Sequence, residues 1–166
     1  MKRLIIIGNG DQSRVIQSII LNKKNYEINY IIDLNGYKRN KDNYLPKVKI
    51  IKNIHSIKNI ENYYFICSLT NNYERKKFVE YLEKKNKKIK WASIISSTSM
   101  ISKHSIIKEG SVIGENVFIG PETIIGRHCF INNNSKIEHH NEFKDFSSTG
   151  PNVVTGGNVK VSEFSY

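Results

Sequence analysis

Two adjacent histidines with acidic neighbours are the residues in this sequence best suited to acid–base chemistry. His139 and His140 lie between Glu138 and Glu142 in the stretch IEHHNE. Imidazole exchanges a proton near neutral pH, so a histidine can take a proton from an attacking amine or hydroxyl. A neighbouring carboxylate can orient the ring and stabilise its charged form. Two solvated histidines on a surface corner would give the same pattern, and the residues alone leave both interpretations open.

A glycine-containing turn near the N-terminus is a second candidate site. The apolar run 4–7 is typical of a strand buried on both faces, and Gly8 and Gly10 follow it before an apolar pattern at helical spacing. Such a turn offers backbone N–H groups to a phosphate. A second apolar run ends at Asp33, whose carboxylate could bond a ribose. Ser13 replaces the third glycine of the G-x-G-x-x-G pattern, so a purely structural turn remains an equal alternative.

The histidine pair lies in a segment that repeats every six residues, from Ile101 to Tyr166. The first position of the hexad is mostly isoleucine, and the fifth is small or β-branched except for the amide Asn141. A period of six fits neither an α-helix nor a single strand. It fits short strands that meet at corners, three hexads per turn, with the first and fifth positions inside the coil. Glycine at the second position allows a corner that a Cβ would obstruct, and it occurs at Gly114, Gly120, Gly126, Gly150 and Gly156.

The N-terminal part reads as a small α/β domain. Short strands are predicted near 48–51, 63–67 and 91–95, and Asn71 or Asn72 is suited to cap a helix before the last of these strands. Residues 1–95 therefore form a predicted Rossmann-like nucleotide-binding domain, and residues 99–166 form the predicted β-helix.

The composition restricts the partners. Lys and Arg number 26 against 15 acidic residues, for a formal charge of +11, which attracts anions such as phosphorylated ligands. No dense basic block with interleaved aromatics occurs, so we expect no nucleic-acid partner. Cys67 and Cys129 lie in apolar runs and make neither a disulfide framework nor a metal quartet, so no metal is expected. The chain lacks a long apolar run and a signal-peptide core, which predicts a cytoplasmic protein without membrane insertion.

The whole chain resembles the bacterial sugar O-/N-acetyltransferases, which join a nucleotide-binding domain to a left-handed parallel β-helix. Members include sialic acid O-acetyltransferases and UDP-4-amino-sugar N-acetyltransferases of glycan synthesis. The resembling stretches are IIIGNGDQSRVIQSI, YIID, SLTNNYERKKF, the hexads, IEHHN and TGGNVKV. The handedness of the coil is taken from this resemblance, because spacing alone does not fix it.

The resemblance implies an activity and a set of site residues. The chain would transfer an acetyl group from acetyl-CoA to a nucleotide-linked amino sugar or sialic acid in surface-glycan biosynthesis. His139 would be the general base, with His140 and Glu138 beside it. The nucleotide part of the sugar would contact Gly8, Gly10, Asp33 and Asn71. Acetyl-CoA would lie between subunits of a homotrimer, along Asn132, Ser148, Gly156 and Gly157.

A second hypothesis is a truncated or degenerate family member that acts as a non-catalytic trimeric binding protein. Its basis is four departures from the family pattern: His140 for the usual acid after the base, Ser148 for a second histidine, Asp11-Gln12 for Gly-His in the first loop, and an early end at Tyr166. Charge tuning of His139 would then have to come from Glu138 or Glu142, or be absent.

Overall fold

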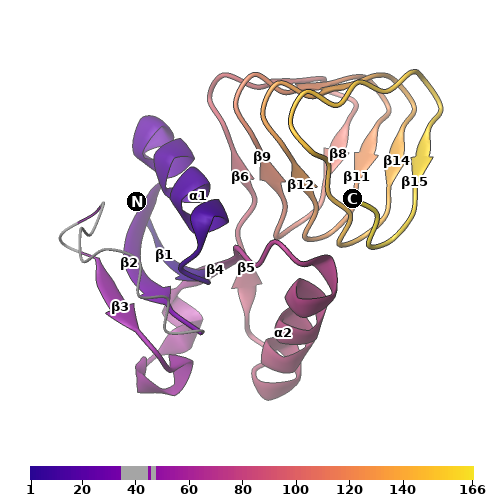
Figure 1. Cartoon of the computed structure of the whole chain (residues 1–166). Coiled ribbons are helices and arrows are strands. Elements are labelled where there is room, and N and C mark those ends of the chain that lie inside the picture. Colours follow the sequence, from indigo (N-terminus) through magenta and orange to yellow (C-terminus); the bar gives the residue numbers. More distant parts are fainter. Residues whose placement is uncertain (35–44, 46–47) are drawn as a thin grey trace. The chain divides into compact units, whose positions relative to one another are not determined.

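The computed structural model describes residues 1–34, 45 and 48–166 (Figure 1). The chain divides into two compact units, Met1–Ala92 and Ser93–Tyr166. The first unit is an α/β domain and the second is a coil of short strands. This agrees with the fold class predicted from the sequence, a Rossmann-like domain followed by a left-handed parallel β-helix of hexapeptide repeats.

The first unit is built on a five-stranded sheet in which every pair of neighbouring strands is parallel. The strand order is β3-β2-β1-β4-β5. The strands are β1 (Lys2–Ile7), β2 (Tyr26–Ile32), β3 (Lys49–Ile51), β4 (Tyr64–Cys67) and β5 (Lys90–Trp91). Side chains of the central strand β1 are inaccessible from Leu4 to Ile7, as expected for a strand covered on both faces.

The helices connect the strands in two directions across this sheet. Helix α1 (Asp11–Lys23) joins β1 to β2, and α2 (Asn72–Lys85) joins β4 to β5, with 3₁₀ turns at Ile54–Ser56 and Ile60–Asn62. Right-handed crossovers in opposite directions put α1 and α2 on opposite faces of the sheet. The point where the direction changes, between β1 and β4, leaves a crevice at the carboxyl ends of these strands.

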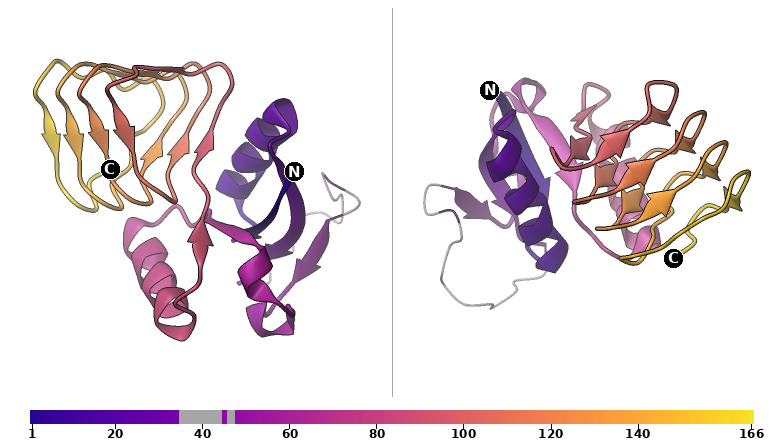
Figure 2. Two further views of the ribbon diagram at one scale, coloured as in Figure 1. Left: turned by 180° about the vertical axis from the view of Figure 1, so that it is seen from behind. Right: turned by 90° about the horizontal axis from the view of Figure 1, so that it is seen from above.

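The second unit stacks short parallel strands into three sheets (Figures 1 and 2). Paired strands are 18 residues apart, as Ile124 is from Ile106, so one turn of the coil contains three hexads as predicted. The sheets are β6 (Ile94–Ile95), β9 (Val112–Ile113) and β12 (Phe130–Ile131); β7 (Met100–Ile101), β10 (Phe118–Ile119) and β13 (Lys136–Ile137); and β8 (Ile106–Ile107), β11 (Ile124–Ile125), β14 (Glu142–Phe143) and β15 (Lys160–Val161).

The interior of the coil follows the hexad. First-position side chains, which are isoleucines and Phe143, form one buried cluster with Val117 and Cys129 from the fifth position. The corners use a left-handed backbone at the fourth position, at Asn116, Glu122, His128, Asn134, His140, Phe146, Asn152, Asn158 and Phe164. At Gly114, Gly120 and Gly126 the second-position glycine therefore serves close packing between turns instead of a positive φ. A Cβ on Gly120 would lie 2.8 Å from the carbonyl carbon of Glu138 in the next turn.

One predicted strand is wrong in its extent. The run 91–95 was expected as a single strand, but the structure divides it between the two units. Lys90–Trp91 forms β5 at the edge of the first sheet, whereas Ile94–Ile95 forms β6 and pairs with β9 of the coil. The hexad pairing therefore begins before Ile101. The hexad 95–100 has Ile95 at its first position and Ser99 at its fifth, but it has Ser96 in place of the second-position glycine.

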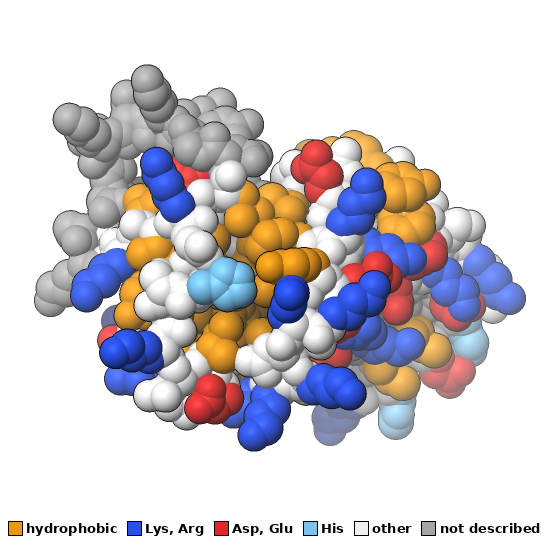
Figure 3. Space-filling view, turned by 90° about the horizontal axis from the view of Figure 1, so that it is seen from below, with side chains coloured by type: hydrophobic (Ala, Val, Ile, Leu, Met, Phe, Trp, Pro, Cys, Tyr) orange, Lys and Arg blue, Asp and Glu red, His pale blue; other side chains and the backbone are white. Residues whose placement is uncertain are grey.

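The charged side chains are dispersed on the face that Figure 3 shows, where basic groups lie among acidic and uncharged ones. In the described part of the chain, no helix is both long and apolar enough to cross a membrane.

Candidate functional site

The histidine pair lies on the corner between β13 and β14, and both side chains are exposed. The Nδ1 atoms of His139 and His140 are 3.0 Å apart, and the two rings are nearly perpendicular, at 88°. The other nitrogen of His140, Nε2, lies 2.7 Å from Oε2 of Glu122. The corner therefore connects a carboxylate to one imidazole and that imidazole to a second one.

The coil itself brings Glu122 to His140. The two residues are 18 positions apart, so they occupy the same corner position in successive turns. Both have the left-handed backbone of that position, with φ of 58° in each case. The same φ at equivalent positions one strand spacing apart favours the same side-chain direction, and the carboxylate lies 2.7 Å from the ring nitrogen.

A buried amide fixes the backbone beneath the histidines. Asn141 is 1% exposed, and its Nδ2 donates to the carbonyl oxygens of Glu138 at 2.6 Å and Gly156 at 2.9 Å. Its Oδ1 accepts from the backbone N–H of Val159 at 2.6 Å. Thr123, one turn earlier, also donates to the Glu138 carbonyl oxygen, at 2.7 Å. Hydrogen bonds thus join the corner that carries His139 to the turn before it and to the turn after it.

Gly157 makes room for the His139 ring. It is the residue one turn beyond His139, and a Cβ there would lie 2.7 Å from Nε2 of the imidazole. A Cβ on the adjacent Gly156 would meet nothing within 4 Å. Of the two glycines predicted to contact acetyl-CoA, one therefore borders the candidate base directly.

Of the two carboxylates expected to tune His139, that of Glu142 makes another contact. Glu142 bonds to Lys144, and this hydrogen bond, with the charges of nearby lysines, holds the pKa of the Glu142 carboxyl below its usual value. The backbone carbonyl oxygen of Glu138 accepts hydrogen bonds from Thr123 and Asn141. The carboxylate that reaches the histidine pair is Glu122, which the sequence analysis did not consider.

Two predicted acetyl-CoA contacts lie on other sides of the coil. Asn132 is on the corner between β12 and β13, where its backbone N–H donates to Oγ1 of Thr149. Ser148 forms a bridge with Phe130 in the sheet of β12. Within one chain, neither residue is brought to the corner of His139.

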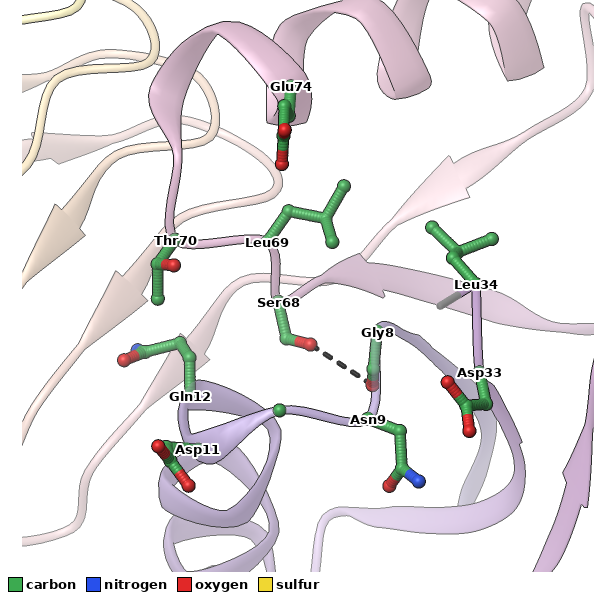
Figure 4. A pocket seen from close by; sticks show the side chains of 11 residues that line it. Gly8, Asn9, Asp11, Gln12, Asp33, Leu34, Ser68, Leu69, Thr70 and Glu74 are labelled. Carbon is green, nitrogen blue, oxygen red and sulfur yellow. Dashed lines mark hydrogen bonds between the residues drawn. The ribbon is translucent and has the colours of Figure 1, made fainter. Parts of the chain in front are cut away.

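The first unit contains a pocket at the carboxyl ends of its strands (Figure 4). It lies at the crevice between β1 and β4 that the topology predicts. Its lining comes from the loop after β1, the first residues of α1, the end of β2, the loop after β4 and α2: Gly8, Asn9, Gly10, Asp11, Gln12, Asp33, Leu34, Ser68, Leu69, Thr70 and Glu74.

Gly8 is required by the local geometry of this pocket. Its φ is +100°, and a Cβ there would lie 2.6 Å from Oγ of Ser68. The Ser68 hydroxyl donates to the carbonyl oxygens of Ile7 and Gly8 and joins the two loops. The predicted residues Gly8, Gly10 and Asp33 all line the pocket. Asn71 does not, because its Oδ1 accepts from the first N–H groups of α2 and caps that helix.

Arg75 holds the wall of the pocket in place. Its side chain is fully buried, and Nη1 donates to the carbonyl oxygens of Leu69 at 2.7 Å and Thr70 at 3.2 Å. Nη2 donates to Oδ1 of Asn72 at 2.7 Å. The sequence analysis missed this role, since an arginine in the first turns of a helix does not reveal which carbonyl groups it reaches.

The described residues give no support for metal-ion chemistry or for Cys67 as a nucleophile. No cluster of three or more histidine, cysteine or acidic side chains there could hold a metal ion. Burial raises the pKa of the Cys67 thiol to about 11, so this cysteine stays protonated at neutral pH and is a poor nucleophile.

Comparison with known proteins extends these observations. Residues 3–82 match the PglD N-terminal domain family. No curated protein matches the sequence. The acetyltransferase domain of PglB from Neisseria gonorrhoeae FA1090 superposes with a TM-score of 0.82 at 19% identity, over 96% of this chain and 76% of that chain. That domain has also been solved in complex with acetyl coenzyme A.

A second solved structure is a histidine-to-alanine mutant of GDP-perosamine N-acetyl transferase from Caulobacter crescentus, in complex with CoA and GDP-perosamine. It superposes with a TM-score of 0.82 at 16% identity, over 96% of this chain and 74% of that chain. WeeI from Acinetobacter baumannii AYE has a TM-score of 0.57 at 14% identity, over 98% of this chain and 92% of that chain. At these identities the likeness establishes the shared fold.

Proposed function

We propose that the chain, whose residues 3–82 match the PglD N-terminal domain family, is an acetyl-CoA-dependent sugar acetyltransferase. The acceptor is a nucleotide-linked amino sugar or sialic acid of surface-glycan biosynthesis. The observation that carries the proposal is the exposed His139 on a coil corner, hydrogen-bonded to His140, whose Nε2 lies 2.7 Å from the Glu122 carboxylate. Proteins of this fold solved with acetyl coenzyme A, or with CoA and GDP-perosamine, support the choice of substrates.

His139 acts as the general base in this proposal. Its Nδ1 is hydrogen-bonded to His140, which leaves Nε2 to take a proton. As the acceptor amine or hydroxyl attacks the carbonyl carbon of the thioester, Nε2 removes its proton. The C–S bond then breaks, and the departing thiolate of CoA takes that proton from the imidazolium. The products are the acetylated sugar and free CoA, and His139 is returned to its neutral form.

The pocket of the first unit holds the nucleotide. Backbone N–H groups of the loop from Gly8 to Gly10 and the start of α1 suit a phosphate, and Asp33 suits ribose hydroxyls. Asn71 contributes by starting α2 beside this pocket. The described residues of the lining include no lysine or arginine, so we expect hydrogen bonds from these residues, more than cations among them, to hold the nucleotide.

The acetyl-CoA site is shared between subunits of a homotrimer in this proposal. Gly156 and Gly157 lie on the corner of His139, whereas Asn132 and Ser148 lie on other sides of the coil and would be supplied by a neighbouring subunit. Met100, Ile106 and Val154 of the coil are 69%, 54% and 69% exposed, and large exposed apolar side chains favour burial against symmetric copies. The reaction takes place in the cytoplasm.

The test is acetyl transfer by the purified chain. We expect release of free thiol from acetyl-CoA with at least one acceptor in a panel of nucleotide-linked amino sugars and sialic acid. We also expect calorimetric binding of acetyl-CoA and a trimer in sedimentation. A trimer with neither turnover nor acetyl-CoA binding would instead support the non-catalytic binding protein. A monomer would exclude the shared site.

Substituting Gly157 tests the position of the base. We expect Gly157→Ala to lower kcat/KM by roughly 10- to 100-fold, because its Cβ would push the His139 ring out of place and small misplacements of catalytic groups are costly. Gly150→Ala is the matched control, since a Cβ there would meet nothing within 4 Å. Binding of acetyl-CoA, measured separately, distinguishes a displaced base from a blocked substrate. Wild-type kinetics for Gly157→Ala would show that the ring does not act from this position.

A further inference from the structure

We infer that Glu122 is a positioning residue that acts through His140 to fix the tautomer of His139. The inference rests on the proposed function in taking His139 as the base, but the two contacts that carry it are present whatever the substrate is. They run from Oε2 of Glu122 to Nε2 of His140 at 2.7 Å, and from Nδ1 of His140 to Nδ1 of His139 at 3.0 Å.

The chemistry of the three groups assigns each proton. An ionised carboxylate oxygen at 2.7 Å would repel the lone pair of an unprotonated ring nitrogen, so Nε2 of His140 carries a proton. In neutral His140 the other nitrogen, Nδ1, is then an acceptor. The bond between the two Nδ1 atoms therefore requires His139 to carry its proton on Nδ1. The result is a His139 whose Nε2 has a lone pair, on the nitrogen that lies beside Gly157.

Among the described residues, Glu122 is the carboxylate that contacts the histidine pair and so sets which ring nitrogens carry protons. On the turn of the histidines, Glu138 contributes its backbone carbonyl to the corner network, and Glu142 is bonded to Lys144. The turn beyond it presents Gly157 and Asn158, which do not titrate. The turn before it presents Glu122.

The same connection stabilises the charged state that the reaction creates. When Nε2 of His139 takes a proton, the ring becomes a stronger donor to His140, and the positive charge is shared along a path that ends at Glu122. The carboxylate thus does through one intervening imidazole what a carboxylate does when it bonds a catalytic histidine directly. His140 is accordingly a functional substitute for an acid at its position.

Removing this carboxylate tests positioning without unfolding the coil. The side chains of His140 and Glu122 are 49% and 64% exposed, and exposed ion pairs contribute little to folding stability. Glu122→Gln keeps the shape and removes the charge. A glutamine can also donate to His140, so it no longer dictates which nitrogen of that ring carries the proton.

The experiment combines ¹⁵N NMR of histidine-labelled protein at neutral pH with kinetics. In the wild-type chain we expect His139 as the Nδ1–H tautomer and His140 as the Nε2–H tautomer. In Glu122→Gln we expect both rings to become tautomer mixtures and kcat to fall by roughly 10- to 30-fold. KM for both substrates should change less than twofold. Glu109→Gln, which removes a carboxylate paired with Arg127 on another corner, should leave tautomers and kcat unchanged.

Two results would overturn the inference. One is a wild-type His139 in the Nε2–H form. The other is a Glu122→Gln variant that keeps both wild-type tautomers and the wild-type kcat. The NMR readout requires no turnover, so a failure of the proposed function remains distinguishable: tautomers that depend on Glu122 in a chain without acetyl transfer would retain the inference and remove the enzyme.

Discussion

Replacing His139 with alanine is expected to lower kcat for acetyl transfer by roughly 10²- to 10⁴-fold, the range that general-base catalysis commonly supplies. The imidazole is exposed at a coil corner, and its Nδ1 is already bonded to His140. Alanine removes the ring nitrogen that takes the proton from the sugar substrate. The sugar amine or hydroxyl must then attack the thioester while still protonated, or lose its proton to water. Steady-state acetyl transfer, followed as thiol release, measures the loss.

The size of this effect must be separated from changes in binding and folding. Calorimetric affinity for acetyl-CoA should change little in His139→Ala, because the loss is confined to the chemical step. His55→Ala is the matched control, since His55 is exposed on the 3₁₀ turn Ile54–Ser56 of the first unit and should not affect turnover. A His139→Ala enzyme that retains wild-type kcat would remove this residue from the mechanism.

The six-residue period predicted much of the coil because its physical requirements are local. An aliphatic first position and a small fifth position fill a narrow interior, and both requirements are visible in any single hexad. The strand limits at 91–95 were less predictable. Short apolar runs look alike whether they pair within an α/β sheet, as Trp91 does, or within a coil, as Ile94 does.

The site was only partly predictable because its contacts cross turns of the coil. His139 and His140 were recognisable from their side-chain chemistry, but Glu122 lies 18 residues earlier and has no sequence signal of its own. Three hexads per turn place residue 122 beneath residue 140, so a search at this spacing could have found the pair. The contacts of Gly157 with the His139 ring follow the same spacing. Arg75, by contrast, depends on the path of a loop, which no repeat predicts.

Asn141 did have a sequence signal, as the single amide at the fifth hexad position, and its replacement gives the largest expected loss of stability. We expect Asn141→Val to destabilise the coil by about 3 to 4 kcal/mol, because it leaves buried polar groups unsatisfied. Valine occupies the fifth position at Val117 and Val153, so its volume fits the narrow interior. The loss would therefore come from the missing hydrogen bonds to Gly156 and Val159.

The measurement must report on the coil itself. The single tryptophan, Trp91, lies in β5 of the first unit, so its fluorescence would follow the wrong part of the chain. Hydrogen exchange at the Val159 amide is direct, because this N–H donates to Oδ1 of Asn141, and its protection should fall at least tenfold, equivalent to about 1.4 kcal/mol or more of local stability. The matched control is Ser135→Ala. Ser135 is equally buried at the same hexad position, but its hydroxyl makes only longer hydrogen bonds, such as one of 3.3 Å to the Gly150 carbonyl.

The control should cost about 1 kcal/mol, the contribution of an ordinary hydrogen bond. Equal losses in Asn141→Val and Ser135→Ala would mean that the amide does not hold the corner. The expected difference would instead show that Asn141 cross-links the corner of His139 more strongly than Ser135 cross-links its own corner. A base that must meet a thioester and an acceptor within a few tenths of an ångström needs such support, because the exposed ring itself has few packing contacts to fix it. The buried amide of Asn141 fixes the backbone that carries the His139 imidazole. We therefore expect turnover to fall in Asn141→Val even under conditions where the coil remains folded.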